Sequence, residues 1–217
     1  MTDGRSLRKE RERVGELGRK MLKQGLTRGS GGNVSVRSDD RVAISPSGVA
    51  YEDVTAESVP IVDLDGERLE GELKPSNETP MHTILYRERD DIGGIVHTHS
   101  PYASTFASLN EPIPASHYLI AYAGQEIPVA GYEPPGTEAL GELAADAMGQ
   151  DHDAVLLKNH GVMAVGETGE GALEVAQMVE FCARIHHQAL AVGEPEIMDS
   201  EDVEYLRHMF KEDYGQQ

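Results

Sequence analysis

The sequence predicts an α/β fold in which helices cover a mixed β-sheet. Three observations predict it. Segments with helical spacing alternate with short apolar strands, tight turns join three pairs of strands, and no linker, repeat or low-complexity stretch interrupts the 217 residues. Hairpins pair their strands antiparallel, so the sheet cannot be purely parallel. The length and the unbroken pattern predict a single domain over residues 1–217.

The first half of the chain begins with a helix. Apolar residues from Leu7 to Met21 recur at helical spacing, and Gly25 predicts the end of that helix. Turn signals then separate short apolar runs, which is typical of hairpins. The elements expected here are strands 34–37 and 41–44, strands 59–64 and 67–69 around Asp65-Gly66, and a helix from Ser76 or Asn77 to about residue 89.

The second half alternates strands and helices more regularly. Residues 94–99 are apolar enough for a buried strand, and Ser100-Pro101 has the composition of a helix start. The turn Asn159-His160-Gly161 predicts a third hairpin. The remaining elements are strands at 127–130, 154–157 and 162–165, a helix from Thr137 to about residue 148, a long helix from Thr168 to about residue 192, and a last helix capped by Ser200.

The chain is strongly acidic, with 38 acidic against 19 basic side chains and a formal charge of −19. No basic stretch could offset this charge against a phosphate backbone, which excludes nucleic-acid binding. The carboxylates are spread through the whole sequence. Because salt screens their mutual repulsion, they predict a halophilic protein from a salt-rich cytoplasm. The alternative is an unusually acidic mesophilic enzyme.

The sequence carries no sign of a membrane span or a secretion signal. No apolar run approaches the ~20 residues that cross a bilayer, and the N-terminus is charged from Arg5 to Arg13. The single cysteine, Cys182, excludes an internal disulfide, and its apolar helical neighbours predict a packed core thiol. These features predict a cytoplasmic protein without a membrane partner.

His97-Thr98-His99 is the sharpest local signal for chemistry. Residues two apart on a strand point to the same face, so both imidazoles can reach one metal ion. His160 lies in a tight turn, where its side chain could complete a set of three. Three imidazoles form a zinc site that leaves one coordination position open. The alternative is that these are surface histidines with ordinary hydrogen-bond partners.

Glu78 is the natural fourth ligand, at the expected start of a helix. An acidic side chain there is equally explained by its favourable interaction with the helix dipole. Polar, glycine-rich loops at 29–33 and 45–48 resemble the segment 74–77 that precedes Glu78, and helix-start amides suit an anion. Each loop alone could be a flexible turn. Three of them without a nucleotide-binding motif predict a small phosphorylated substrate.

The remaining histidines give weaker signals. His82 lies one turn after Glu78 and could be a group behind the metal ligands, but the sequence favours a helix-surface histidine. His117 lies beside Tyr118 in a region without clear periodicity, which leaves its role open. The sequence shows no convergent partners for the other four, His152, His186, His187 and His208.

Six motifs in a fixed order resemble the class II aldolase/adducin family across nearly the whole chain. They are residues 25–37, Ile44-Ser45-Pro46-Ser47-Gly48, Pro75-Ser76-Asn77-Glu78, Val96-His97-Thr98-His99, Pro114-Ala115-Ser116-His117-Tyr118 and Leu157-Lys158-Asn159-His160-Gly161. The resemblance implies a three-layer α/β/α fold with a mixed, largely antiparallel central sheet. It also implies assembly as a homotetramer.

The resemblance further implies roles for individual residues. One Zn²⁺ per subunit, or another divalent metal, would be held by His97, His99, His160 and Glu78. The substrate's phosphate would bind Ser30, Asn33, Ser47, Gly48, Ser76 and Asn77. Asn77 stands where a hydroxyl residue is expected, and its amide can still donate to phosphate. Tyr118 and Tyr214 would each reach the site of a neighbouring subunit, so that the sites lie at subunit interfaces.

The implied activity is the reversible cleavage of a ketose 1-phosphate into dihydroxyacetone phosphate and an aldehyde. L-fuculose 1-phosphate is the first substrate to expect, with L-lactaldehyde as the aldehyde. Zinc would act as Lewis acid, Glu78 as the base at the carbon next to the carbonyl, and Tyr118 as a donor to the aldehyde oxygen.

Three alternatives stay open. A pentulose-phosphate 4-epimerase of the same family typically has aspartate where this chain has Glu78, which favours the aldolase. A methylthioribulose-1-phosphate dehydratase is the second alternative. An adducin-like scaffold would keep the fold without the chemistry, and the presence of all three histidines and Glu78 argues against it.

Overall fold

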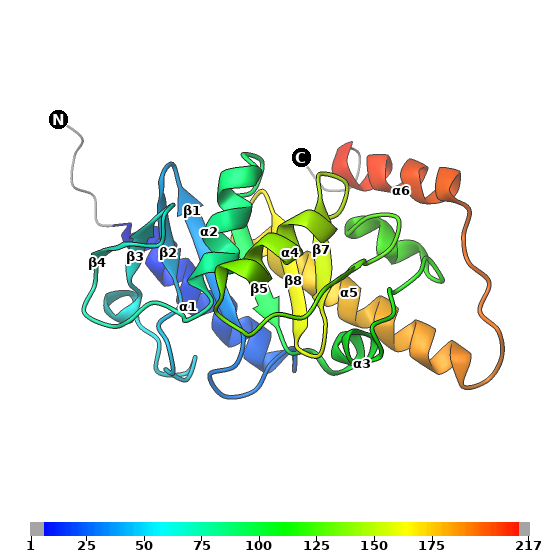
Figure 1. Cartoon of the computed structure of the whole chain (residues 1–217), viewed down its shortest axis with the longest axis horizontal. Helices are drawn as coiled ribbons and strands as arrows, with labels where there is room; N and C mark the ends of the chain where they lie inside the picture. The colour runs from blue at the N-terminus through cyan, green and yellow to red at the C-terminus, as the bar shows by residue number, and fades with distance from the viewer. Residues whose placement is uncertain (1–6, 213–217) are drawn as a thin grey trace.

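A computed structural model describes residues 7–212, and within them it contains one eight-stranded sheet with helices on both faces (Figure 1). All neighbouring strands pair antiparallel except the last two, which are parallel. The expected mixed, largely antiparallel sheet is therefore confirmed. In spatial order the strands are β4 (Arg68–Glu70), β3 (Ile61–Asp63), β2 (Arg41–Ile44), β1 (Asn33–Ser38), β5 (Gly94–Thr98), β8 (Gly161–Gly166), β7 (Ala154–Leu157) and β6 (Val129–Ala130).

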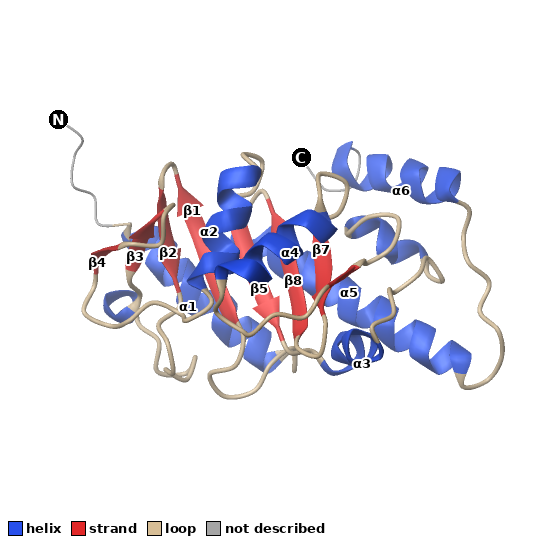
Figure 2. Cartoon of the chain, viewed as in Figure 1, coloured by secondary structure: helices blue, strands red, loops and turns tan. Residues whose placement is uncertain are grey.

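The helices form a layer on each face of the sheet, as Figure 2 shows. One layer contains α1 (Arg8–Lys23), α3 (Pro101–Leu109) and α5 (Gly169–Leu190). The opposite layer contains α2 (Thr79–Glu88) and α4 (Glu138–Met148), which pack against each other. The last helix, α6 (Ser200–Glu212), packs against the short 3₁₀ helix η2 (Tyr118–Tyr122), and a second 3₁₀ helix, η1 (Ala56–Ser58), precedes β3.

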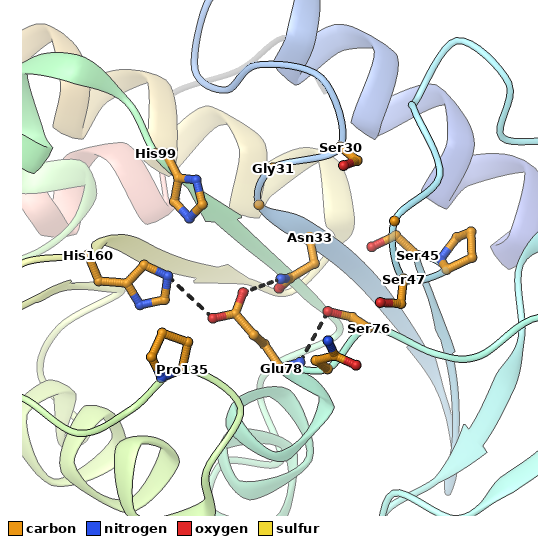
Figure 3. Close-up of a pocket in the computed structure, with 14 residues that line it drawn as sticks. Ser30, Gly31, Asn33, Ser45, Ser47, Ser76, Glu78, His99, Pro135 and His160 are labelled. Carbon is orange, nitrogen blue, oxygen red and sulfur yellow. Dashed lines mark hydrogen bonds and ion pairs between the residues drawn. The ribbon is translucent and has the colours of Figure 1, made fainter.

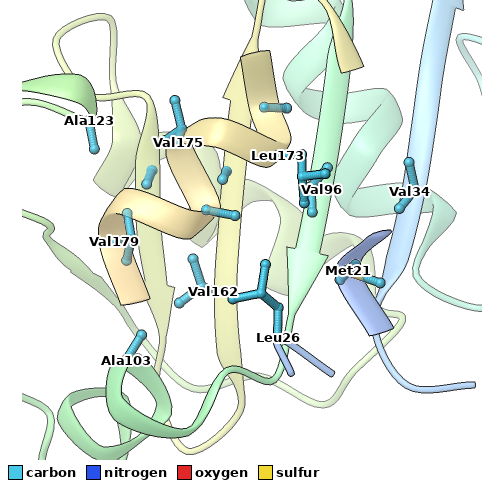
Figure 4. Close-up of a cluster of buried hydrophobic side chains, with 14 of the residues drawn as sticks. Met21, Leu26, Val34, Val96, Ala103, Ala123, Val162, Leu173, Val175 and Val179 are labelled. Atoms are coloured by element: carbon cyan, nitrogen blue, oxygen red, sulfur yellow. The ribbon is translucent and has the colours of Figure 1, made fainter. Parts of the chain in front are cut away.

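The central strands are buried on both faces, so their side chains supply two separate cores. In β5, Val96 packs into the core under α1 and α5, whereas Ile95 packs into the core under α2 and α4. Figure 4 shows Val96 in the first of these cores with Val162 of β8 and Leu173 of α5. Two-sided burial produces the continuous apolar runs that identified these strands in the sequence.

Tight turns close the hairpins as expected. Asp39 joins β1 to β2 and Asn159 joins β7 to β8, and both residues adopt a left-handed backbone with φ of 56°. Asparagine and aspartate tolerate this conformation better than other residues that carry a Cβ. The hairpin at 59–69 also forms, with strands shorter than expected.

Three further predicted boundaries are wrong. The helix α2 is capped by Glu78, because Ser76 instead forms the turn before it, accepting from the Glu78 N–H at 3.2 Å. The strand expected at 127–130 is only Val129–Ala130, since Ile127 pairs with Ile113 in an isolated bridge. The helix α6 begins with Ser200 itself instead of after it.

Other sequence expectations hold. The Thr137 and Thr168 hydroxyls accept from the backbone N–H groups of Leu140 and Gly171 at the starts of α4 and α5. Cys182 is a buried core thiol, and burial raises its pKa to about 12. Within residues 7–212, no helix combines the length and apolar character needed to cross a bilayer.

Candidate active site

The candidate site lies at one end of the central strands β1, β5 and β8, where four segments of the chain meet (Figure 3). β1 begins at Asn33, which pairs with His97 near the end of β5. On the other side of β5, Thr98 pairs with Val162, so the turn before β8 places His160 beside the end of β5. Because α2 begins directly after Glu78, that carboxylate faces the same corner.

The structure brings the three predicted histidine ligands together. Their ring centroids are 4.7 to 5.2 Å apart, and the Nε2 atoms of His97 and His99 are separated by 3.0 Å. One ligand atom from each of His97, His99 and His160 lies within 4.8 Å of the other two. Histidines that lie this close together and converge from two segments of the chain have the arrangement of a metal-binding site.

Glu78 completes the cluster. Its Oε2 lies 3.4 Å from His97 Nε2, and its Oε1 lies 3.3 Å from His160 Nε2. The side chain is 13% exposed, so the carboxylate is largely removed from water. The four residues predicted as ligands therefore face one another.

The protonation state of His97 suits metal binding. Its Nδ1–H donates to the Val162 carbonyl at 2.8 Å, which leaves the lone pair on Nε2 free to coordinate. Burial, followed by the neighbouring His160 and His99, holds the pKa of His97 well below its usual range. Burial and His160 also lower the pKa of His99. These two imidazoles are therefore neutral at pH 7, as metal ligands must be.

Two buried polar atoms of this cluster need a partner. Among the described residues, neither Glu78 Oε1 nor His160 Nδ1 has a hydrogen-bond partner. A buried polar atom without a partner is costly, and at a functional site it indicates an unfilled role such as ion binding. Three imidazoles and a carboxylate are a donor set that zinc prefers, so a divalent metal fits this site.

Two glycines allow the backbone to approach the histidines closely. Gly32 has φ of +67°, and a Cβ there would lie 2.4 Å from the His97 carbonyl oxygen. A Cβ at Gly161 would lie 2.2 Å from the Thr98 carbonyl oxygen. Any larger residue would push β1 or the His160 turn away from β5, so these two glycines are needed to assemble the cluster.

A pocket of about 310 Å³ opens beside this cluster. It contains all six residues expected to bind phosphate, together with Glu78, His99 and His160. Five lining residues were missed by the sequence analysis, namely Gly31, Gly32, Ser45, Pro46 and Pro135. The first four lie inside the recognised motifs. Pro135 comes from a distant loop, and its sequence signal, Pro134-Pro135-Gly136, indicates only a turn.

The pocket offers neutral hydrogen-bond donors. Among the described residues that line it there is no lysine or arginine. The Ser76 Oγ accepts from the Glu78 N–H, so its own O–H is free to donate into the pocket. An anion bound here would be held by hydroxyl and amide groups, with positive charge supplied by a metal ion and the start of α2.

His82 is buried behind this pocket, so the favoured interpretation as a helix-surface residue is wrong. Its Nδ1 lies 2.7 Å from the Ser35 hydroxyl, and its Nε2 lies 2.5 Å from the Asn33 Oδ1. Complete burial, followed by the nearby His97, lowers the pKa of His82 to about 3. It lies behind the cluster of histidines and Glu78, bonded to Asn33.

The other histidines lie outside the pocket lining. His186 and His152 each make an ordinary hydrogen bond instead of joining a cluster. The His186 Nδ1 lies 2.9 Å from the Ser116 hydroxyl, and the His152 Nδ1–H donates to the Met148 carbonyl. The His117 ring accepts from the Leu119 N–H and caps η2. The side chains of His187 and His208 also have interaction partners.

Tyr118 is not brought into the pocket within one chain. It is 48% exposed, and its ring lies against those of His117 and Phe210. Tyr214 lies outside the described residues. The expectation that both tyrosines reach a neighbouring subunit therefore stays a prediction.

Comparison with known proteins identifies the class. Residues 12–187 match the family described as class II aldolase and adducin N-terminal domain. The chain is 49% identical over 213 residues to 5-deoxy-D-ribulose 1-phosphate aldolase of Bacillus thuringiensis serovar kurstaki, covering 97% of this chain and 99% of the relative. The chain belongs to the class II aldolase and adducin family. The family resemblance and the expected three-layer fold are therefore confirmed.

Two further proteins to which this chain is similar are also named as aldolases. A 5-methylthioribulose-1-phosphate/5-deoxyribulose-1-phosphate aldolase of Rhodospirillum rubrum is 37% identical, over 90% of this chain and 88% of the relative. A solved structure of an L-fuculose 1-phosphate aldolase superposes with a TM-score of 0.91 at 40% identity, covering 94% of this chain and 96% of that one. With these relatives, the expectation of an enzyme is confirmed. The protein is a metal-dependent class II aldolase, a carbon–carbon lyase.

Proposed function

We propose that the protein is a zinc-dependent aldolase that reversibly cleaves the 1-phosphate of a short deoxyketose into dihydroxyacetone phosphate and an aldehyde. One observation carries the proposal. His99, His160 and Glu78 of the histidine cluster line the same pocket as the polar loops at 29–33, 45–48 and 74–77, although these segments lie far apart in the sequence. A metal centre beside an anion site is what a phosphorylated ketone requires.

The bound metal would act as a Lewis acid that withdraws electron density from the substrate's carbonyl. His97, His99 and His160 would hold it, together with Glu78 when no substrate is present. Zinc is favoured over other divalent ions because imidazole nitrogen provides three of the four ligands. Metal analysis of the purified protein tests this choice.

Glu78 is the group that moves the proton. Its Oε1 lacks a hydrogen-bond partner among the described residues, so it can accept a proton from C3 of dihydroxyacetone phosphate in the synthetic direction. In the cleavage direction the same carboxyl returns the proton to C3 after the C3–C4 bond breaks. The C4 hydroxyl becomes the carbonyl of the departing aldehyde, so a group other than Glu78 must accept the proton of that hydroxyl.

The phosphate would occupy the end of the pocket away from the histidines. The Ser30, Ser47 and Ser76 side chains and Asn77 line the pocket and can donate to phosphate oxygens. The backbone N–H of Ser47 is already bonded to the Lys74 carbonyl, and that of Ser76 to the Ser45 carbonyl. Serine hydroxyls, rather than these two amides, are therefore the donors to expect.

The candidate substrates differ in the aldehyde that they release, because all of them contain the same dihydroxyacetone phosphate half. The relative named for 5-deoxy-D-ribulose 1-phosphate is 49% identical, whereas the solved L-fuculose 1-phosphate aldolase is 40% identical. We therefore place 5-deoxy-D-ribulose 1-phosphate first, with acetaldehyde as the product. L-fuculose 1-phosphate, which yields L-lactaldehyde, comes second. Both aldehydes end in a methyl group.

The decisive experiment supplies each ketose 1-phosphate to the zinc-loaded protein and measures dihydroxyacetone phosphate with a coupled NADH assay. We expect release from one or both substrates and none after chelation of the metal. Inversion at C4 without release would instead support an epimerase, and loss of water a dehydratase. A zinc-loaded protein that transforms none of them would contradict the proposal.

We also propose that the active enzyme is a homotetramer in which Tyr118 and Tyr214 serve a neighbouring site. The exposure of Tyr118 beside Phe210 supports this, because an aromatic surface of that kind suits a subunit contact. Light scattering tests the assembly, and Tyr118→Phe tests the role. That variant should keep proton exchange on dihydroxyacetone phosphate while cleavage slows. A fully active monomer would contradict the shared site.

A further inference from the structure

A chain of buried polar groups runs from the candidate base into the core between β1 and α2. Glu78 Oε2 contacts Asn33 at 2.7 Å, Asn33 contacts His82 at 2.5 Å, His82 contacts Ser35 at 2.7 Å, and Ser35 contacts the Tyr86 hydroxyl at 2.8 Å. His82, Ser35 and Tyr86 are completely shielded from solvent, and Asn33 is nearly so. None of them except Asn33 lines the pocket.

The chemistry of the groups fixes the direction of every hydrogen bond. A carboxylate only accepts, so Asn33 must present its Nδ2–H to Glu78, which turns its Oδ1 toward His82. That oxygen also only accepts, so His82 Nε2 must carry the proton. The bare Nδ1 then accepts from the Ser35 hydroxyl, and the Ser35 oxygen accepts from Tyr86. All donors point toward Glu78.

The geometry points to His82 as a positioning residue for the base. We propose that the His82 Nε2–H fixes the Asn33 amide in the orientation that donates to Glu78 Oε2. This hydrogen bond holds the carboxylate so that Oε1 remains the proton acceptor. Turned by half a rotation, the amide would present its oxygen to the carboxylate and repel it. The inference rests on the proposed role of Glu78 and assigns the group that orients it.

A structural role for His82 and a positioning role predict different things. If His82 only fills space between β1 and α2, its loss lowers stability and leaves the reaction rate per folded molecule unchanged. If it orients Asn33, the loss falls on proton abstraction, with little change in the KM for dihydroxyacetone phosphate. Removing the hydrogen-bonded partner of an active group typically costs about 10–100-fold.

Two amide substitutions separate these outcomes. Gln at position 82 places its side-chain nitrogen close to where the histidine Nε2 lies and can donate to Asn33. Asn is one methylene shorter, so it can reach Ser35 but not Asn33. His152→Asn is a matched control, because that histidine bonds to the Met148 carbonyl away from the pocket.

We expect His82→Asn to lose about 10–100-fold in the rate of deuterium exchange into dihydroxyacetone phosphate, at unchanged zinc content and KM. His82→Gln should retain most of the rate, and His152→Asn all of it. Full exchange in His82→Asn would overturn the proposal. So would a loss in His82→Gln as large as in His82→Asn, or a loss that follows zinc content alone.

A second measurement does not depend on activity. The ¹⁵N chemical shifts of the His82 ring in the unsubstituted protein should identify a neutral imidazole with the proton on Nε2. A proton on Nδ1 would overturn the proposal even if His82→Asn failed to fold. If the unsubstituted protein exchanged no proton, the proposed aldolase function would fail, and the ring shifts would still decide whether His82 orients Asn33.

Discussion

Two buried carboxylates of this protein have opposite surroundings. Asp153, at the end of the sheet far from the pocket, has both oxygens bonded to arginine: Oδ1 lies 3.0 Å from Arg89 Nη2, and Oδ2 lies 3.1 Å from Arg207 Nη2. Glu78 has one oxygen bonded to the Asn33 amide and one without a hydrogen-bond partner among the described residues. Arginine neutralises the first, whereas only neutral groups and histidines surround the second.

The difference separates a structural cluster from a reactive one. Arg89 also donates to Asp91 and to the His152 carbonyl, so it joins β7 to the end of α2, and Arg207 attaches α6 to the same point. A charge that is fully paired stabilises one arrangement and has no capacity left for a ligand. A carboxylate held at one oxygen keeps the other for a metal ion or a proton.

Glu78→Gln tests the reactive side of this comparison and should have the largest effect. Glutamine keeps the shape but cannot accept a proton, so exchange of the substrate's proton with deuterated solvent should fall by ~10²–10⁴-fold. Zinc and dihydroxyacetone phosphate should still bind. A carboxylate that only favours the helix start would instead cost about 0.3–1 kcal/mol of stability with exchange intact. NMR of the dihydroxyacetone phosphate protons decides between them.

His160→Ala tests whether the incomplete hydrogen bonding of this cluster reflects metal binding. Losing a direct ligand should weaken zinc affinity by more than the roughly 10–100-fold typical for an outer partner. The purified variant should therefore contain far less than one zinc per chain by mass spectrometry. A full equivalent of zinc together with full activity would show that His160 is not the third ligand.

Asp153→Asn tests the structural side. The change leaves Arg207 and part of Arg89 without their anionic partner in a buried site, which should cost about 3 kcal/mol of the free energy of unfolding. Urea unfolding measures this loss. The exchange rate per folded molecule should not change, because Asp153 lies outside the pocket lining. A variant with normal stability and slow exchange would show that Asp153 serves the reaction instead of the fold.

His82 should make the site end of the molecule sensitive to acid. Its folded pKa of about 3 lies below the value near 6.5 expected in the unfolded chain. Between these values only the unfolded state binds the proton, so stability falls as the pH drops from about 6.5 toward 3. The slope is at most about 1.4 kcal/mol per pH unit. In metal-free protein, His82→Gln should remove this contribution, measured by urea unfolding at several pH values.

Salt should have the smallest effect on stability among these tests, and this effect should not depend on either carboxylate. The net charge of −19 repels itself at low ionic strength, and molar KCl shortens the Debye length to ~3 Å. Thermal midpoints of the unsubstituted protein and of Asp153→Asn should therefore rise together with salt. A midpoint that stays flat or falls between dilute buffer and molar KCl would reject the halophilic interpretation.

The sequence determined the local parts of this protein well. The three hairpins, the alternation of helices and strands and the mixed sheet follow from periodicity and turn residues, because these depend on neighbours within a few positions. The pair His97 and His99 was recognisable for the same reason, since strand geometry alone places both on one face. Errors in these local elements were confined to helix and strand ends, where competing turns such as that of Ser76 decide the boundary.

Only the tertiary structure decided how these parts meet. No pattern in the sequence relates His82 to Asn33, because the pairing of β1 with β5 and the packing of α2 bring them together. Nor does any pattern relate Pro135 to the polar loops at 29–33, 45–48 and 74–77 that line the same pocket. Burial has the same origin. Whether a histidine faces water or the core depends on elements distant in sequence, and this decides its protonation and partners. Residue types therefore indicate which chemistry is available, and long-range packing selects which side chains can perform it.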